Sequence, residues 1–413
     1  MRRSLSWQIA LTPHVGTEKS DEQIVKAQQG VTSTPDPRPQ LERLGWLFVA
    51  KARESHDNGF YKLAEQCALA LQVNDEKSPG GLLLRGHVAQ SLHRFKEAEA
   101  IARQLVAQRE LAFDHGLLGD ALADQGKLDE AIAEYQRMVD LRPELQSYSR
   151  VAHARWLKGD LTGAIEAATL AVRAASPQNA EASAWAFTRL ATFQAQAGAA
   201  ASAEAAVETA GKFVPDYAPA LLLRGRMLLT ARKYSEASEL LRRASEKNPL
   251  PEYQWALADA LRAANRISEA EAVETELKRT GAANDPRTFA LFLATRGEQI
   301  DLALRLAKRE LQDRADIFTH DALAWAQSAA GHHAEAWTAM ERALAEGTQD
   351  ARLFLHAAVI AARLDRENAA DGLTRARGLA NLLLPSEREH LTQGASRVNK
   401  AVAPPDGPRT EAR

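Results

Sequence analysis

Residues 113–135 read FDHGLLGDALADQGKLDEAIAEY, and this stretch decides the fold. Leucines and small residues recur at helical spacing on both sides of Gln125-Gly126. Apolar residues three and four apart predict an amphipathic helix. A glycine between two such segments tolerates the left-handed backbone that ends the first helix. The stretch therefore predicts two short helices joined by a tight turn.

The same pattern recurs along the chain, and one alanine marks it in every copy. Successive marker alanines lie 34, 33, 33, 39, 34, 33, 33, 33 and 33 residues apart. They are Ala64, Ala98, Ala131, Ala164, Ala203, Ala237, Ala270, Ala303, Ala336 and Ala369. A fixed period of this length is typical of repeat architectures.

Further columns share the period. Twelve residues before each marker alanine stands Ala or Gly, except for Leu291, and small residues there let packed helices approach closely. Five residues before the marker, several copies carry a residue that suits a left-handed turn. These are Gly59, Gly126, Gly159, Gly198, Asn265 and Gly331. In three copies a proline twelve residues after the marker is expected to stop the second helix. These are Pro143, Pro215 and Pro249.

This pattern resembles the tetratricopeptide repeat, over about 340 of the 413 residues, from near Leu41 to near Ala380. The resemblance implies an all-α fold, a right-handed α-solenoid of about ten helix-turn-helix units. Neighbouring units must stack, because no unit can bury its apolar face alone. Two departures are expected to show in the structure. The spacing of 39 predicts a longer loop or helix near residues 176–179, and the last unit has Leu364 where others have the turn glycine.

Four segments follow from this register. The predicted boundaries are 1–40 for an irregular N-terminal extension and linker, 41–380 for the solenoid, 381–400 for a C-terminal capping helix, and 401–413 for a disordered tail. Ser386 is expected to cap the last helix, since acidic residues follow in its first turn.

Composition narrows the classes of function. Lys and Arg total 52 against 54 Asp and Glu, so the net charge of -2 provides no drive toward nucleic acid or an anionic membrane. The single cysteine, Cys67, excludes an internal disulfide framework and a cysteine metal cage. No stretch approaches the roughly 20 apolar residues of a membrane span. The N-terminus is a poor signal peptide, which favours a cytoplasmic location; a periplasmic or secreted protein stays open if translation starts upstream.

The resemblance also implies a concave groove lined by the first helix of each unit. Residues just after the small column, and others on the same face, are expected to form a partner-binding groove. They are His87, Asp120, His153, Trp156, Trp185, Arg226, Trp255, Asp259, Arg262, Phe292 and Trp325. Aromatic residues and Arg dominate the energetics of protein interfaces. Each tryptophan can instead pack between repeats, and both readings stay open.

No catalytic, cofactor-binding or metal-binding residue is predicted, so the chain is not expected to be an enzyme. His87, Asp120 and His153 invite a metal-site reading, but they fall on three successive first helices. Packed helices lie about 8–10 Å apart, which puts the two histidines on the order of 16–20 Å apart, too far to share a zinc ion. The sequence also lacks a phosphate-binding loop, a nucleophile elbow and a zinc-protease helix motif.

We therefore expect a scaffold or adaptor that binds a protein or peptide in its groove, without intrinsic catalysis, cofactor, nucleic acid or membrane span. The alternative is a non-catalytic accessory subunit of an enzyme or of an envelope-assembly complex. The groove column after the small residue contains no Asn and no Lys. It thus does not support the clamp that some tetratricopeptide domains close on the acidic C-terminus of a chaperone.

Overall fold

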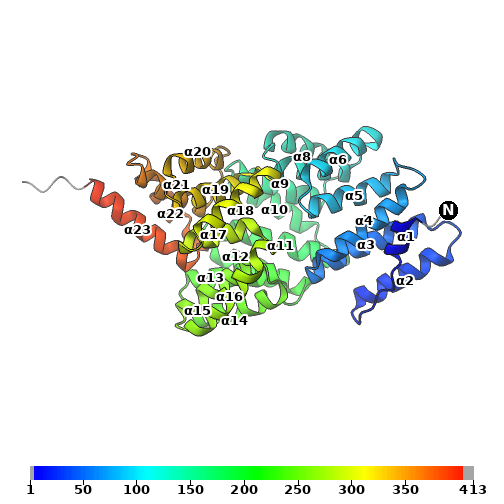
Figure 1. Ribbon diagram of the computed structural model, residues 1–413, viewed down its shortest axis with the longest axis horizontal. Helices are drawn as coiled ribbons and strands as arrows, with labels where there is room; N and C mark the ends of the chain where they lie inside the picture. The colour runs from blue at the N-terminus through cyan, green and yellow to red at the C-terminus, as the bar shows by residue number, and fades with distance from the viewer. Residues whose placement is uncertain (1–3, 403–413) are drawn as a thin grey trace, which may run out of the picture. The chain divides into compact units, whose positions relative to one another are not determined.

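The computed structural model describes residues 4–402 (Figure 1). In this span the chain forms 23 α-helices and two short 3-10 helices, and no strand. The predicted all-α repeat fold is confirmed. The chain divides into two compact units, Met1–Pro143 and Glu144–Arg413, each described in turn.

Unit 1 contains two N-terminal helices followed by three helix pairs. The helices are α1 (Leu5–Ala10), α2 (Lys19–Ser33), α3 (Arg38–Ser55), α4 (Asn58–Gln72), α5 (Pro79–Ser91), α6 (Phe95–Arg109), α7 (Ala112–Asp124) and α8 (Leu128–Leu141).

Unit 2 contains seven helix pairs and a C-terminal helix. The pairs are α9 (Leu145–Leu157) and α10 (Leu161–Arg173), α11 (Ala180–Gln196) and α12 (Ala200–Phe213), α13 (Ala218–Thr230) and α14 (Tyr234–Lys247), α15 (Pro251–Ala263) and α16 (Ile267–Asn284), α17 (Pro286–Arg296) and α18 (Ile300–Asp313), α19 (Ile317–Ala329) and α20 (His333–Ala343), and α21 (Ala351–Arg363) and α22 (Ala369–Gly378). The short helix η2 (Ala380–Leu382) and α23 (Pro385–Val402) follow.

The marker alanines lie in the second helix of every pair, where each is at most 4% exposed. The small column lies in the first helix, and close approach explains it. A Cβ on Gly119 would stand 2.4 Å from Cε1 of Tyr135, and one on Gly225 would stand 2.5 Å from Leu241. Larger side chains at these two points would therefore push the paired helices apart.

The turn column has the expected left-handed backbone at Gly126, Gly159, Gly198, Asn265 and Gly331. Gly59 is an exception, because it lies inside α4 and His56 makes that turn instead. The fold imposes the same conformation where no glycine stands. His93 and Arg232 occupy the equivalent positions with φ of 59° and 58°.

The extra residues near position 176 lengthen the connection between α10 and α11, and α11 itself, as expected. They form the 3-10 helix η1 (Pro177–Asn179), and α11 has 17 residues where α9 and α13 have 13. The three stop prolines also behave as predicted, since α8, α12 and α14 each end two residues before one.

The expectation of an irregular extension over residues 1–40 is wrong, because α1 and α2 form there. Ile24, Ala27 and Val31 are spaced three and four apart on α2 and bury themselves in the core of unit 1. Asp21 closes a capping box with Glu18 at the start of α2. Its carboxylate also lies 2.9 Å from Lys51 Nζ and 2.8 Å from His14 Nε2, and these contacts lower its pKa.

The C-terminal helix forms, but it does more than cover the last pair. Helix α23 packs on α21 and α22 of that pair, and its beginning also contacts α15 and α17. The helix starts at Pro385, so Ser386 lies in the first turn rather than at the cap. Of the predicted disordered tail, residues 403–413 lie outside the described residues.

Unit 2 also closes on itself. Thr348, in the loop after α20, donates a hydrogen bond to the Leu157 carbonyl at the end of α9, with 2.5 Å between oxygens. Lys158 Nζ lies 2.5 Å from Glu346 in the same loop. Trp156 of α9 stacks on Phe318 of α19 with ring centroids 5.7 Å apart. The solenoid of unit 2 thus returns to its own first helix.

Candidate functional site

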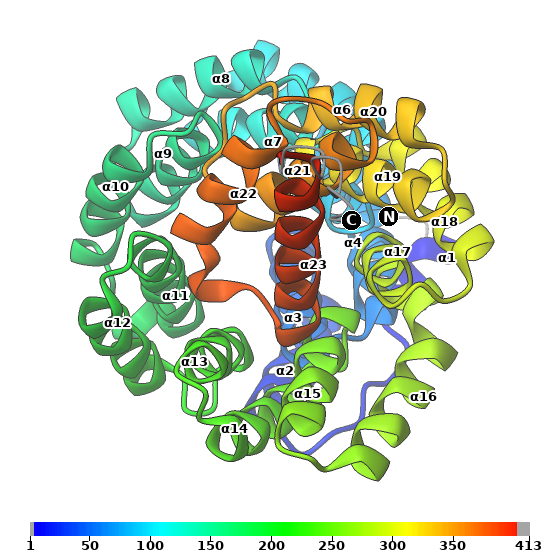
Figure 2. The same cartoon turned by 90° about the vertical axis from the view of Figure 1, so that its left-hand side faces the viewer.

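The concave face of unit 2 is occupied by the chain's own C-terminal segment, residues 380–391. Figure 2 shows α11, α13, α15 and α17 around α23, which runs through the middle of the unit. Apart from α22, which directly precedes the segment, the helices with several contacts to it are first helices: α11 and α13 contact η2, and α15, α17 and α21 contact α23. First helices therefore line the concave face, as predicted, and the segment is its occupant.

The segment is held at its beginning through main-chain groups. Arg226 on α13 donates from Nε and from a terminal nitrogen to the Leu382 carbonyl, at 2.9 and 2.6 Å. Thr230, one turn later, donates to the Asn381 carbonyl. Asn381 in turn donates to the Ala195 carbonyl on α11 at 3.2 Å. Helix α13 thus binds the backbone of η2, and α11 accepts a hydrogen bond from the Asn381 side chain.

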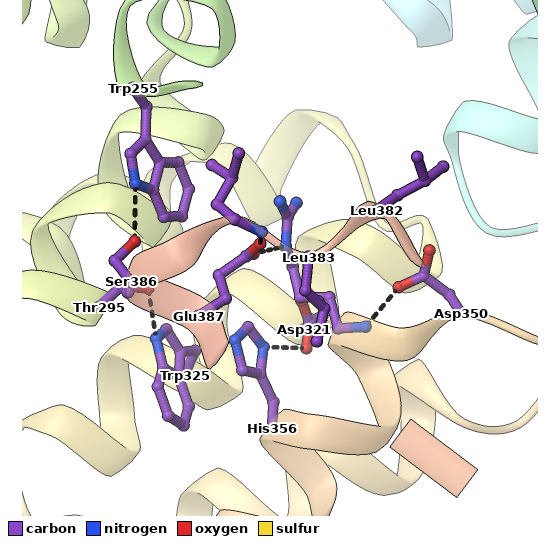
Figure 3. A network of polar contacts seen from close by, with 12 residues as sticks. Trp255, Thr295, Asp321, Trp325, Asp350, His356, Leu382, Leu383, Ser386 and Glu387 are labelled. Carbon is purple, nitrogen blue, oxygen red and sulfur yellow. Dashed lines mark hydrogen bonds and ion pairs between the residues drawn. The ribbon is translucent and has the colours of Figure 1, made fainter. Parts of the chain in front are cut away.

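A second anchor lies at the start of α23, where Ser386 meets α15 (Figure 3). Asp259 Oδ2 accepts from the Ser386 N–H at 2.9 Å and from its hydroxyl at 2.6 Å. The Trp255 indole N–H donates to the same hydroxyl at 3.2 Å. Burial raises the pKa of Asp259 to about 6, although both hydrogen bonds from Ser386 act to lower it.

Glu387 forms the third anchor and is 1% exposed. Its Oε1 lies 2.5 Å from Nε of Arg352 on α21, and its Oε2 accepts from the Leu384 N–H at 2.7 Å. The Arg352 guanidinium also lies over the Trp255 ring, 5.6 Å from its centroid. Burial opposes ionisation of Glu387, but the positive charge of Arg352 outweighs it and the pKa is lowered. Removing one partner of such a buried pair costs about 3–5 kcal/mol.

The fourth anchor is His390, which reaches α17 and α19. Its Nε2 lies 2.8 Å from the Thr295 carbonyl and therefore donates. The Trp325 indole donates to the Thr295 hydroxyl at 3.0 Å, and its ring meets His390 edge-on. Behind it, His356 stacks on Trp325 at 4.0 Å and binds Asp321 through Nδ1 (Figure 3). Burial lowers the pKa of His390.

Several predicted groove residues thus bind this segment or the core rather than facing solvent. Trp255, Asp259 and Trp325 are at most 3% exposed, and Arg226 is bound to Leu382. Phe292 is buried against Trp255, with ring centroids 5.8 Å apart.

Two other groove candidates are held within the repeats. Arg262 forms two hydrogen bonds to Glu274 in the second helix of its own pair, at 2.7 and 2.8 Å. Trp156 is 6% exposed, and its ring stacks on His153. Of the four predicted groove tryptophans, only Trp185 remains exposed, at 39%. The other three are buried: Trp156 against His153 and Phe318, and Trp255 and Trp325 partly against the C-terminal segment.

The groove candidates of unit 1 are partly buried. His87 Nε2 lies 2.8 Å from a guanidinium nitrogen of Arg53, and its ring lies 5.3 Å from that of Trp46. Asp120 accepts from the Tyr135 hydroxyl at 3.0 Å. Both predicted residues therefore lie between successive helices of the array. Their role as partner contacts stays a prediction.

The sequence analysis missed Arg352 and His390 as members of the site. A signal was present in residues 382–389, LLLPSERE, where three leucines precede a helix start. An apolar run at the end of a solenoid has to pack on something, and Leu383 and Leu384 are at most 3% exposed. The repeat register gave no clue to where it packs, since the segment lies outside the repeats.

The family pattern described as tetratricopeptide repeat matches residues 83–146, 118–180 and 222–286. The chain contains tetratricopeptide repeats. No curated protein matches its sequence significantly. Among solved structures, human IFIT1, in a dimer with PPP-AAAA, is 16% identical with a TM-score of 0.51, and the match covers 79% of this chain and 77% of that one. Yeast Tom70 is 14% identical over 92% of this chain and 93% of that one, with a TM-score of 0.40. At 16% identity, the likeness of these tetratricopeptide repeats to IFIT1 concerns the fold alone.

Within residues 4–402 no group of three or more His, Cys, Asp or Glu side chains is arranged to hold a metal ion. In the same described span, no helix is both long and apolar enough to cross a membrane.

Proposed function

We propose that this chain is a scaffold that binds proteins or peptides on the concave faces of its repeat array, without catalysing a reaction. One observation carries the proposal: the concave face of unit 2 already holds a peptide segment. Arg226 and Thr230 bind carbonyls of that segment, and Asp259 binds an N–H. Main-chain groups occur in every peptide, so these side chains suit segments of many sequences.

An accessory subunit of an enzyme or of an envelope-assembly complex would use the same surface, with the enzyme or another subunit as its partner. The two functions differ in the identity of the bound protein. Co-purification of a catalytic chain would favour the accessory role.

The test places a photo-crosslinking amino acid at exposed positions of matched exposure on the two faces. Trp185, on first helix α11, is 39% exposed, and Leu170, on second helix α10, is 41% exposed. The full-length protein is irradiated in the native host and its adducts are identified by mass spectrometry. We expect a defined protein adduct from position 185 and none of that protein from position 170.

Equal adducts from both positions would show contact without a concave preference and would contradict the proposed surface. No protein adduct from position 185, with a second label at Ile267 on α16 as a further control of 41% exposure, would contradict the scaffold function itself. The Leu170 and Ile267 labels also report whether the substituted proteins fold and accumulate.

The expectation that the chain does not bind nucleic acid stays a prediction. The solved IFIT1 structure contains PPP-AAAA, so that compound is the sharpest probe. With a net charge of -2, we expect no binding of labelled PPP-AAAA even at low salt. Fluorescence anisotropy that rises and saturates would contradict this. The cytoplasmic location also stays a prediction, and fractionation of the native host tests it.

A further inference from the structure

A charged residue occupies a core position of the repeat in α11. Arg189 lies two residues before Ala191 of the small column. In the other nine units this position holds Ala50, Leu84, Leu117, Arg150, Leu223, Ala256, Phe289, Ala322 and Leu355. Eight of these nine are apolar, so the repeat expects an apolar side chain at Arg189. A residue that breaks a local rule of the fold in this way points to a function.

The side chains that touch Arg189 are aromatic and neutral. Its guanidinium lies over the Phe193 ring, 4.9 Å from the centroid, and over the Trp156 ring at 5.8 Å. A terminal nitrogen donates to Nδ1 of His153 at 3.2 Å. Burial lowers the pKa of His153 to about 3, so this imidazole is neutral and accepts the hydrogen bond. Phe318 stacks on Trp156, with ring centroids 5.7 Å apart.

Within the described residues, no carboxylate lies within ion-pair distance of Arg189. Other arginines of the unit's first helices have one: Arg226 pairs with Glu252 at 3.0 Å, and Arg287 with Asp316 at 2.9 Å. Burial also lowers the pKa of Arg189, to about 10. A largely buried charge that no carboxylate contacts is costly, and an anion supplied from outside would reduce that cost.

We propose that Arg189 binds a carboxylate of a partner peptide, with an apolar side chain of the same peptide resting on Trp185. This inference rests on the proposed scaffold function. Trp185 and Arg189 are four residues apart on α11 and therefore share a face. Arg189 retains partial exposure, and Trp185 is the most exposed tryptophan of the predicted groove.

The chemistry of the site favours a carboxylate over a phosphate. A phosphate group carries close to two negative charges and usually gathers several cations. Here one guanidinium contacts no carboxylate, Glu252 adds negative charge nearby, and Glu252 and Asp316 already engage Arg226 and Arg287. A singly charged carboxylate matches the two-pronged geometry of one guanidinium.

The C-terminal segment leaves this site unused. Its hydrogen bonds and ion pairs to the first helices go to Ala195, Arg226, Thr230, Trp255, Asp259, Thr295 and Arg352. Within the described chain, no hydrogen bond or ion pair joins residues 380–391 to Arg189. A partner can therefore bind Arg189 without displacing the segment.

The test uses 3-phenylpropionate as the probe, with 3-phenylpropanol as its uncharged match and phenyl phosphate as the doubly charged one. Binding to the full-length protein is followed by NMR at the Arg189 Nε–H and the Trp185 indole N–H. For a ligand this small, a Kd on the order of 1–10 mM is expected. We expect the carboxylate to shift both resonances saturably, and the alcohol and the phosphate to bind at least ten-fold more weakly.

Variants assign the effect to the guanidinium. Arg189→Gln should weaken binding of 3-phenylpropionate at least ten-fold, and Arg189→Lys should keep part of it. Arg279→Gln, on an exposed arginine of α16, is the matched control and should bind as the wild type does. If the alcohol binds as well as the carboxylate, if R189Q binds like the wild type, or if no resonance shifts, the inference is overturned. Should R189Q fail to fold, Trp185→Ala, at an exposed position, gives the same decision through the carboxylate affinity, which we expect to fall several-fold.

The result separates this inference from the scaffold proposal. Crosslinks from position 185 that persist in R189Q, without probe binding to the wild type, would leave the scaffold standing and remove the carboxylate site. Probe binding that depends on Arg189, without any crosslinked protein, would support the carboxylate site and contradict the scaffold function.

Discussion

Replacing Asp259 by Asn should strengthen docking of the C-terminal segment at neutral pH. The carboxylate is buried and its pKa is raised to about 6, whereas an aspartate in water titrates near 4. The docked state therefore binds the proton more tightly than the undocked state does. The contribution of this group to docking is complete below about pH 4 and is lost as the pH rises through 6.

The magnitude follows from the shift. About two pKa units correspond to about 3 kcal/mol above pH 7. Part of this loss falls in an accessible window, since docking should weaken about ten-fold between pH 5 and pH 7.5 on account of Asp259. Asn does not titrate, and its amide oxygen can accept the same two hydrogen bonds from Ser386.

Amide hydrogen exchange of residues 384–391 measures docking directly. Other groups of the segment titrate too, including His390 and Glu387, so the two proteins are compared at each pH and the shared effects cancel. We expect D259N to be the better protected protein at pH 7.5, and its advantage to grow about ten-fold from pH 5. A constant ratio, or weaker protection of D259N at pH 7.5, would refute the reasoning.

Three further predictions concern single residues. Burial lowers the pKa of His390, so the undocked imidazole takes up a proton first and docking should weaken on acidification below about pH 6.5. His390→Gln should remove this loss. Amide exchange of the segment from pH 7.5 to pH 5 checks this, and an unchanged acid response would speak against it. Gly119→Ala should lower the free energy of unfolding of unit 1 in urea by about 1–2 kcal/mol, because the new Cβ meets Tyr135. Gly211→Ala on α12 meets no neighbouring atom and should raise the free energy of unfolding by about 1 kcal/mol. Similar effects of the two substitutions would exclude the packing argument. Arg232 has a left-handed backbone, which is strained for a residue other than glycine. Arg232→Gly should therefore raise the unfolding midpoint, with a gain in stability of about 1 kcal/mol. A lowered midpoint would show that the backbone at this position is not strained.

The repeat fold could be predicted because every pair of helices solves the same packing problem. Because the same alanine recurs ten times at a fixed spacing, the pattern can be detected, whereas one alanine in one helix could not be distinguished from chance. All ten are buried in the structure. Helix α2 was missed for the opposite reason. It occurs once, and its pattern of Ile24, Ala27 and Val31 has no second copy to reinforce it.

The face of the groove was predictable, but its occupant was not. The register placed Asp259 and Arg226 on the groove face, and both bind the C-terminal segment. Their partners lie more than 120 residues away, at Ser386 and Leu382, and contacts over such separations leave no period in a sequence. Arg189 was discoverable, because it is a charged residue in an apolar column, yet the groove columns chosen did not include that position.

The contact between Thr348 and Leu157 joins residues 191 positions apart, and it changes how unit 2 is expected to fold. An open array of repeats gains stability step by step from nearest neighbours and can fray from either end. A ring has no free end, since α9 is held by the loop after α20 as well as by α10. Closing it requires a long loop of chain to find its partner, which raises contact order and slows folding. Unit 2 should therefore open as a single cooperative block, with its terminal pairs protected as well as its central ones.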